Sequence, residues 1–141
     1  MPFAEDFIKG IPHEQYLLEE GGVATHLFGF KSSTGRNDNK LEQSINWNDD
    51  DQAINFTLNQ TKEDGSIQFR HGVVTVPLEE IERLNNRPYI KDMISCERSF
   101  VEGNPYHGNL LIPDNVSKPT RNLVSAGLAL AVSKIIHLES E

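Results

Sequence analysis

The stretch SKPTRNLVSAGLALAVSKIIHLESE, Ser117 to Glu141, decides the predicted fold. Ser117 is a typical helix N-cap residue, and Pro119 suits the first turn of a helix. Apolar side chains then follow on nearly every side of the helix, from Leu123 to Leu138. A helix that is apolar all round needs burial all round, so we expect a long, largely buried C-terminal helix packed across a sheet.

Two interpretations of this helix stay open. In the first, the sheet and shorter helices cover it completely; in the second, one of its faces continues into a homodimer interface. A membrane-spanning helix is not expected, because about 20 apolar residues are needed and Ser133 and Lys134 interrupt the run.

The sheet is predicted from the segment Ala53–Val76. Apolar and polar residues alternate in AINFTLN, Ala53–Asn59, which is the pattern of a half-buried strand. The Asp-Gly pair that follows favours a hairpin turn. In the returning strand, a bulge at Gly72 would place Val74 and Val76 on the core face. We therefore expect a β-hairpin at the centre of the sheet.

The remaining segments complete an antiparallel α+β fold. We expect helices at Ala4–Lys9 and Pro77–Asn86, and an exposed loop at Lys31–Lys40. Further strands are predicted at Val23–Phe30, Ser44–Asn48 and Gly108–Pro113. Together these elements predict a single domain over residues 1–141, with an antiparallel sheet of about four or five strands.

Composition and charge narrow the function classes. The chain carries 13 Lys+Arg against 21 Asp+Glu, a net charge of −8, so the basic surface that grips a nucleic-acid backbone is not expected. A single cysteine, Cys96, allows no internal disulfide. The first residues, MPFAEDFIKGIP, show no signal-peptide pattern, and we expect a cytoplasmic protein.

Catalytic and metal-binding patterns are sparse. The histidines show no zinc-ligand spacing, and phosphate-loop and nucleophile-elbow motifs are absent, so we expect no metal and no cofactor. An alternative hypothesis assembles His71, His107, Cys96 and Glu97 in a pocket beside the C-terminal helix, as an enzyme or ligand-binding site. A histidine can favour the thiolate of Cys96, and a carboxylate can orient the ring.

The preferred hypothesis is a non-catalytic protein-interaction module of the inhibitor, immunity or adaptor type. It would bind a protein partner, expected to be basic, through an acidic surface or a sheet edge. The expected binding residues are Asp49, Asp50, Asp51, Glu79, Glu80, Glu82 and Tyr106.

Overall fold

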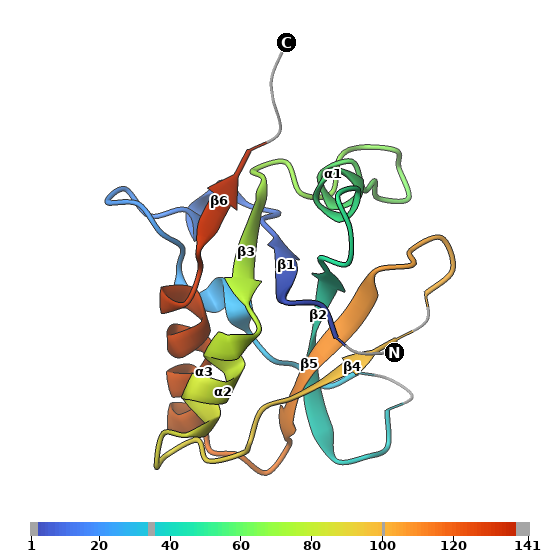
Figure 1. Cartoon of the computed structure of the whole chain (residues 1–141). Helices are drawn as coiled ribbons and strands as arrows, with labels where there is room; N and C mark the ends of the chain where they lie inside the picture. Colours follow the sequence, from blue (N-terminus) through green and yellow to red (C-terminus); the bar gives the residue numbers. More distant parts are fainter. Residues whose placement is uncertain (1–2, 34–35, 100, 138–141) are drawn as a thin grey trace.

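The computed structural model describes residues 3–33, 36–99 and 101–137, and these form an α+β fold (Figure 1). The strands are β1 Asp6–Gly10, β2 Lys40–Trp47, β3 Val73–Pro77, β4 Ser95–Arg98, β5 His107–Pro113 and β6 Lys134–Ile136. The helices are α1 Ala53–Leu58, α2 Glu79–Asn85 and α3 Lys118–Leu130, with 3-10 turns η1 Glu14–Tyr16 and η2 Thr25–Phe28.

One antiparallel sheet joins the described strands in the order β4-β5-β2-β1-β3-β6. β1 lies between β2 and β3 in this sheet. It pairs with β2 at Phe7 and Ile8 and with β3 along its whole length. The six strands exceed the expected four or five. Both edge strands, β4 and β6, are short.

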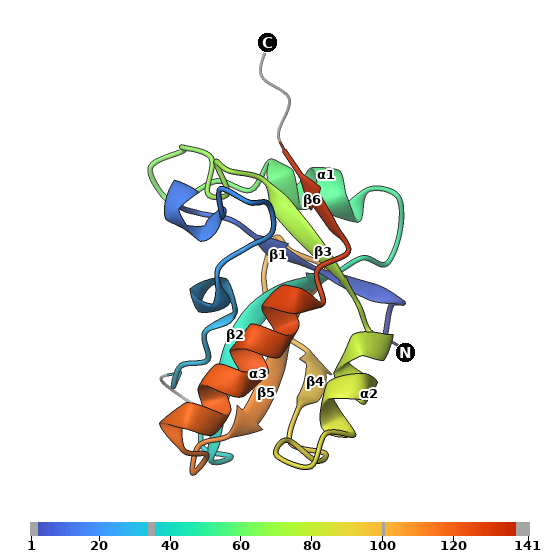
Figure 2. The ribbon, with the colours of Figure 1, turned by 90° about the vertical axis from the view of Figure 1, so that its left-hand side faces the viewer.

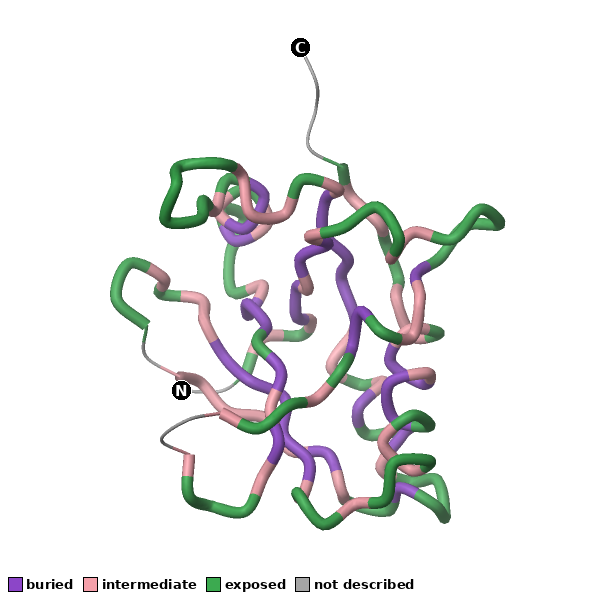
Figure 3. Tube along the Cα trace, turned by 180° about the vertical axis from the view of Figure 1, so that it is seen from behind, coloured by how far each residue is buried: buried purple, intermediate pink, exposed green. Residues whose placement is uncertain are grey.

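The two faces of the sheet carry separate cores, because successive side chains of a strand point to opposite faces. Phe7 packs with Trp47, Val124 and other residues in the main core. Ile8 packs instead in a smaller core that includes Ala53 and Leu58 of α1. Helices α2 and α3 thus cover one face and α1 the other (Figure 2). The buried stretches concentrate in the central strands (Figure 3).

The C-terminal helix begins as predicted but is shorter. Ser117 is its N-cap, and its Oγ accepts a hydrogen bond from the amide of Thr120 (3.3 Å). The helix ends at Leu130, and β6 then pairs with β3. β-Branched Ile135 and Ile136 favour a strand, and pairing with β3 satisfies their backbone groups. Leu138, the expected last residue of the helix, lies outside the described residues.

Burial of this helix is also less complete than predicted. Val124 and Leu128 are fully buried in the main core, whereas Leu123 is 50% exposed and Leu130 is 86% exposed. The helix therefore packs through one face, across η2 and beside α2, and leaves its outer face in solvent.

The predicted central hairpin is wrong, because AINFTL forms helix α1 rather than a strand. Buried Ala53, Thr57 and Leu58 share one helical face against the smaller core. A tight turn does form at Asp64, whose carboxylate accepts from the amide of Ser66 (2.9 Å). The residues on either side of this turn form only an isolated bridge and not a pair of strands. The Asp-Gly pair therefore predicted the turn correctly, whereas the alternating pattern before it wrongly predicted a strand.

Gly72 is not a bulge; it introduces β3 with a positive φ of 100°. A Cβ at this position would collide with the carbonyl of Ile136 on the neighbouring edge strand. Val74 and Val76 nevertheless lie in the main core, as expected.

Two further predictions are wrong and three are confirmed. Ala4–Lys9 contains most of strand β1 instead of a helix, and Val23–Phe30 contains η2 instead of a strand. The predicted strands Ser44–Asn48 and Gly108–Pro113 lie largely within β2 and β5, and the predicted helix Pro77–Asn86 contains α2.

Candidate functional site

The sheet brings together two acidic groups that are far apart in the sequence. Because β1 is antiparallel to both β2 and β3, the segments that follow these two strands lie beside its first residue, Asp6. The amide of Asn48 donates to the carbonyl of Asp6 (3.1 Å), and that of Leu78 donates to the carbonyl of Glu5 (2.8 Å). We call the carboxylates at this position the acidic end: Glu5, Asp6, Asp49, Asp50, Asp51, Glu79, Glu80 and Glu82.

Asp49 is held in place by Arg98 of β4. The two guanidinium Nη atoms donate to the two oxygens of the carboxylate at 2.9 and 2.5 Å, a bidentate geometry. The guanidinium also lies 5.7 Å from the ring centroid of Trp47, and Phe3 stacks on the same ring. Asp49 is therefore held by an arginine that itself packs against the ring of Trp47.

Asp50 is held by Tyr106, the predicted binding residue that precedes β5. The phenol donates to Asp50 at 3.0 Å, and its ring contacts Phe56 of α1 edge-on. The pKa of Tyr106 is raised, first by desolvation and then by the hydrogen bond and charge of Asp50. The structure thus places Tyr106 together with Asp49, Asp50 and Asp51.

The second acidic group lies in the first turn of α2. Glu79 and Glu82 are exposed, and Glu80 accepts from Arg83 at 2.8 Å. Carboxylates are favourable at this end of a helix because the first amides carry partial positive charge. Within the described part of the chain, neither Glu79 nor Glu82 forms an ion pair.

The residues of the alternative catalytic hypothesis are not assembled in one pocket. Cys96 pairs with Leu110 and packs against the main core, whereas His107 and Glu97 lie on the opposite face of the sheet. His71 precedes β3, so two strands, β1 and β2, separate it from His107 on β5. Burial raises the pKa of the Cys96 thiol to about 11, which leaves it protonated at neutral pH.

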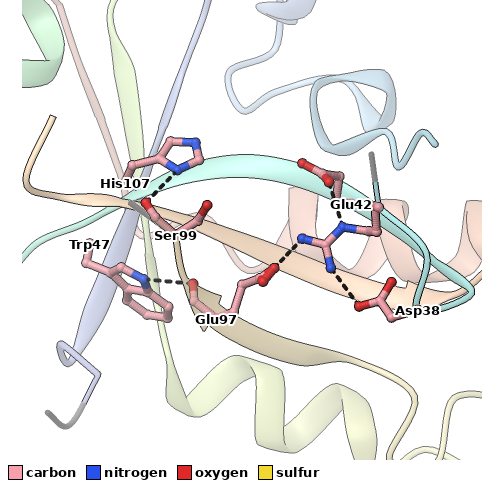
Figure 4. A network of polar contacts seen from close by, with 7 residues as sticks. Asp38, Glu42, Trp47, Glu97, Ser99 and His107 are labelled. Atoms are coloured by element: carbon pink, nitrogen blue, oxygen red, sulfur yellow. Dashed lines mark hydrogen bonds and ion pairs between the residues drawn. The ribbon is translucent and has the colours of Figure 1, made fainter. Parts of the chain in front are cut away.

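Glu97 is engaged by an arginine rather than by a histidine (Figure 4). Arg36, from the loop before β2, donates to Glu97, to Glu42 (2.7 Å) and to Asp38 (2.8 Å). These contacts raise the pKa of Arg36, chiefly through the hydrogen bonds to Glu42 and Glu97. The network ties the predicted loop Lys31–Lys40 to the sheet.

His107 has a backbone partner. Its Nδ1 lies 3.2 Å from the carbonyl of Ser99, which can only accept, so Nδ1 carries the hydrogen (Figure 4). The contact joins the start of β5 to the segment after β4. His107 thus hydrogen-bonds to a loop carbonyl, and Glu97 does not orient its ring.

Sequence reasoning missed the polar residue that joins these segments, Asn46. It is 5% exposed, and its amide donates to Thr57 and Gln60 at 2.8 Å each. Its side-chain oxygen accepts from Asn104 at 2.9 Å. Alternation along β2 correctly indicates that Asn46 faces away from the main core, but only α1, which sequence patterns did not predict, explains its burial.

The described residues contain no group of three or more His, Cys, Asp or Glu placed to hold a metal ion. Within the same residues, no helix has the length and apolar character needed to cross a membrane. Comparisons with protein families, curated proteins and solved structures found no match to this chain.

Proposed function

We propose that this protein is a non-catalytic interaction module that binds a basic surface of a protein partner through the acidic end. Inhibitor, immunity and adaptor proteins act in this way. The observation that carries the proposal is the convergence of Asp49–Asp51 and Glu79–Glu82 beside the first residues of β1. Clustered charge of one sign steers an oppositely charged partner and favours its orientation.

Part of the acidic end is preorganised for binding. Asp49 is fixed by Arg98, and Asp50 by Tyr106, so these carboxylates lose little side-chain freedom when a partner docks. Asp51, Glu79 and Glu82 are exposed and remain available for cations of the partner. The acidic end therefore combines carboxylates held by a partner with exposed ones that form no ion pair among the described residues.

The sheet edges are less suited to the same role. β4 has four residues and β6 has three, and short edge strands are a common protection against pairing with other chains. A catalytic role also has less support, since the thiol of Cys96 faces the main core and the carboxylate of Glu97 is bound by Arg36. These features favour the acidic end as the binding surface over a sheet edge or a catalytic site.

Charge reversal with a matched control tests the proposal. The test variant is Asp51→Lys/Glu79→Lys/Glu82→Lys, and the control is Glu14→Lys/Glu19→Lys/Glu63→Lys, which changes the net charge equally at other exposed positions. Each immobilised protein is used to capture partners from the source cell at low and moderate salt, and captured proteins are quantified by mass spectrometry.

The expected result is that the wild type and the control capture the same basic protein and that the test variant loses it. Raising the salt should weaken capture by the wild type. Equal capture by both variants would contradict the proposal.

We also propose a homodimer whose interface is the outer side of helix α3. Leu123 and Leu130 lie seven residues apart on the outer side of α3, both exposed. If this face forms the interface, ultracentrifugation at high micromolar concentration finds a dimer, and Leu130→Glu converts it to a monomer. A monomeric wild type removes the homodimer.

A further inference from the structure

β1 and β2 separate soon after they meet. Their pairing covers only Phe7 and Ile8, and the next residue of β1, Lys9, reaches across the gap. Its Nζ donates to the carbonyl of Ser44 on β2 at 2.8 Å. Lys9 is paired in register with Val74 of the main core, so its side chain starts on the main-core face of the sheet.

A cavity of about 360 Å³ lies at this gap, between the strands and the two 3-10 turns. Its ionisable groups are Lys9, Lys31, His26 and Tyr16, and Phe69 and Leu27 form apolar walls. No carboxylate lines it among the described residues. In a chain with a net charge of −8, this cavity places two lysines together without a carboxylate beside them.

Gln43 forms a buried part of the wall of this cavity. The residue is 2% exposed, and its Nε2 donates to the carbonyl of Phe28 at 2.9 Å. Its Oε1 has no hydrogen-bond partner among the described residues. Because Oε1 has less than 1 Å² of accessible surface, a ligand in the cavity does not reach it, and Gln43 borders the cavity without offering an open acceptor.

The charge on Lys9 is also only partly compensated. Burial, with a smaller contribution from the charge of Lys31, lowers the pKa of Lys9 to about 8. Within the described part of the chain, Lys9 forms no ion pair and its Nζ bonds only to a neutral carbonyl. An anion beside Lys9 would favour its charged form.

We propose that this cavity binds a small carboxylic acid that carries an apolar substituent. The carboxylate lies near Lys9 and Lys31, and the apolar substituent packs against Phe69 and Leu27. This site is on a different part of the molecule from the acidic end, so the inference does not depend on the proposed function.

The probe is mandelate, which carries a carboxylate and an aromatic ring, and the matched neutral probe is mandelamide. Binding is followed by ¹H–¹⁵N NMR, with the side-chain amide of Gln43 as the reporter. The site predicts saturable shifts at Gln43 and at the residues around Lys9 with mandelate, and at least tenfold weaker binding of mandelamide.

Three variants distinguish binding in the cavity from a general effect of charge. Lys31 is exposed, so Lys31→Met keeps the fold and is expected to weaken mandelate binding about threefold, while Lys62→Met in an exposed turn leaves it unchanged. Lys9→Met is expected to weaken binding about tenfold. Equal binding of both probes, equal effects of Lys31→Met and Lys62→Met, or shifts that avoid Gln43 would each overturn the proposal.

Discussion

Arg98 and Asp49 form a bidentate ion pair that joins the edge strand β4 to the segment after β2. The side chains of Arg98 and Asp49 are 25% and 23% exposed, and the arginine also lies against the ring of Trp47. A fixed geometry and partial shielding from water make such a pair stronger than an ordinary surface contact. It therefore contributes both to stability and to the shape of the acidic end.

Removing this arginine should destabilise the protein. Arg98→Met leaves the carboxylate of Asp49 without its strong partner, and we expect a loss of about 1–2 kcal/mol in the free energy of unfolding. Arg83→Met is the control, because it removes only an exposed pair with Glu80 and should cost less than about 0.5 kcal/mol. Urea denaturation measures both, and equal losses would contradict a special role for Arg98.

The thiol of Cys96 should react slowly at neutral pH. Its pKa of about 11 leaves only a small thiolate fraction, which rises about tenfold per pH unit between pH 7 and pH 10. A chromogenic disulfide reagent measures this rate. The unfolded thiol, with its ordinary pKa of 9.0, loses its proton first, so this group lowers stability as the pH rises from about 9 to 11. Fast reaction at pH 7 would show that Cys96 is activated.

Lys9 has the opposite effect on stability. Its pKa is about 8 in the folded protein and 10.5 unfolded, so between these values the unfolded chain binds more protons. The free energy of unfolding should therefore gain about 2–3 kcal/mol from this group as the pH rises from 8 to 10.5. Denaturation of the wild type and of Lys9→Met across this range isolates the contribution. Parallel pH profiles would show that the pKa of Lys9 is not lowered.

Gly10 should be intolerant of any side chain because of Phe69. A Cβ at Gly10 would overlap the ring of Phe69, which packs directly on the glycine. Gly10→Ala is expected to destabilise the protein by about 1–3 kcal/mol, the usual range for overpacking. In the background Phe69→Leu, the same change should cost at least 1 kcal/mol less, and a double-mutant cycle by thermal unfolding tests the coupling. Additive losses would show that the ring is not the obstacle.

Sequence reasoning found the elements that have their own end signals. The Ser117 cap and Pro119 locate the start of α3, and Pro77 with the glutamates after it locates α2. It failed where tertiary contacts decide. The alternation in Ala53–Leu58 is typical of a strand, but packing on the smaller core favours a helix. β1 is a strand because it has partners on both sides, and neither partner is near it in the sequence.

The candidate site could be predicted only in part, because tertiary contacts also decide which of its residues come together. Asp49–Asp51 and Glu79–Glu82 are recognisable as acidic groups, and their convergence depends on two strand pairings that no local pattern indicates. The contact of Tyr106 with Asp50 depends on the same sheet. No pattern in the sequence indicates that Arg98 holds Asp49.

The most direct test of the acidic end as a binding surface is an NMR titration of the wild-type protein with a tetralysine peptide. The account predicts that chemical-shift changes concentrate at Asp49–Asp51 and Glu79–Glu82 and decline with added salt. Changes spread evenly over all exposed carboxylates, or centred on the distant pair Glu19 and Glu20, would contradict it.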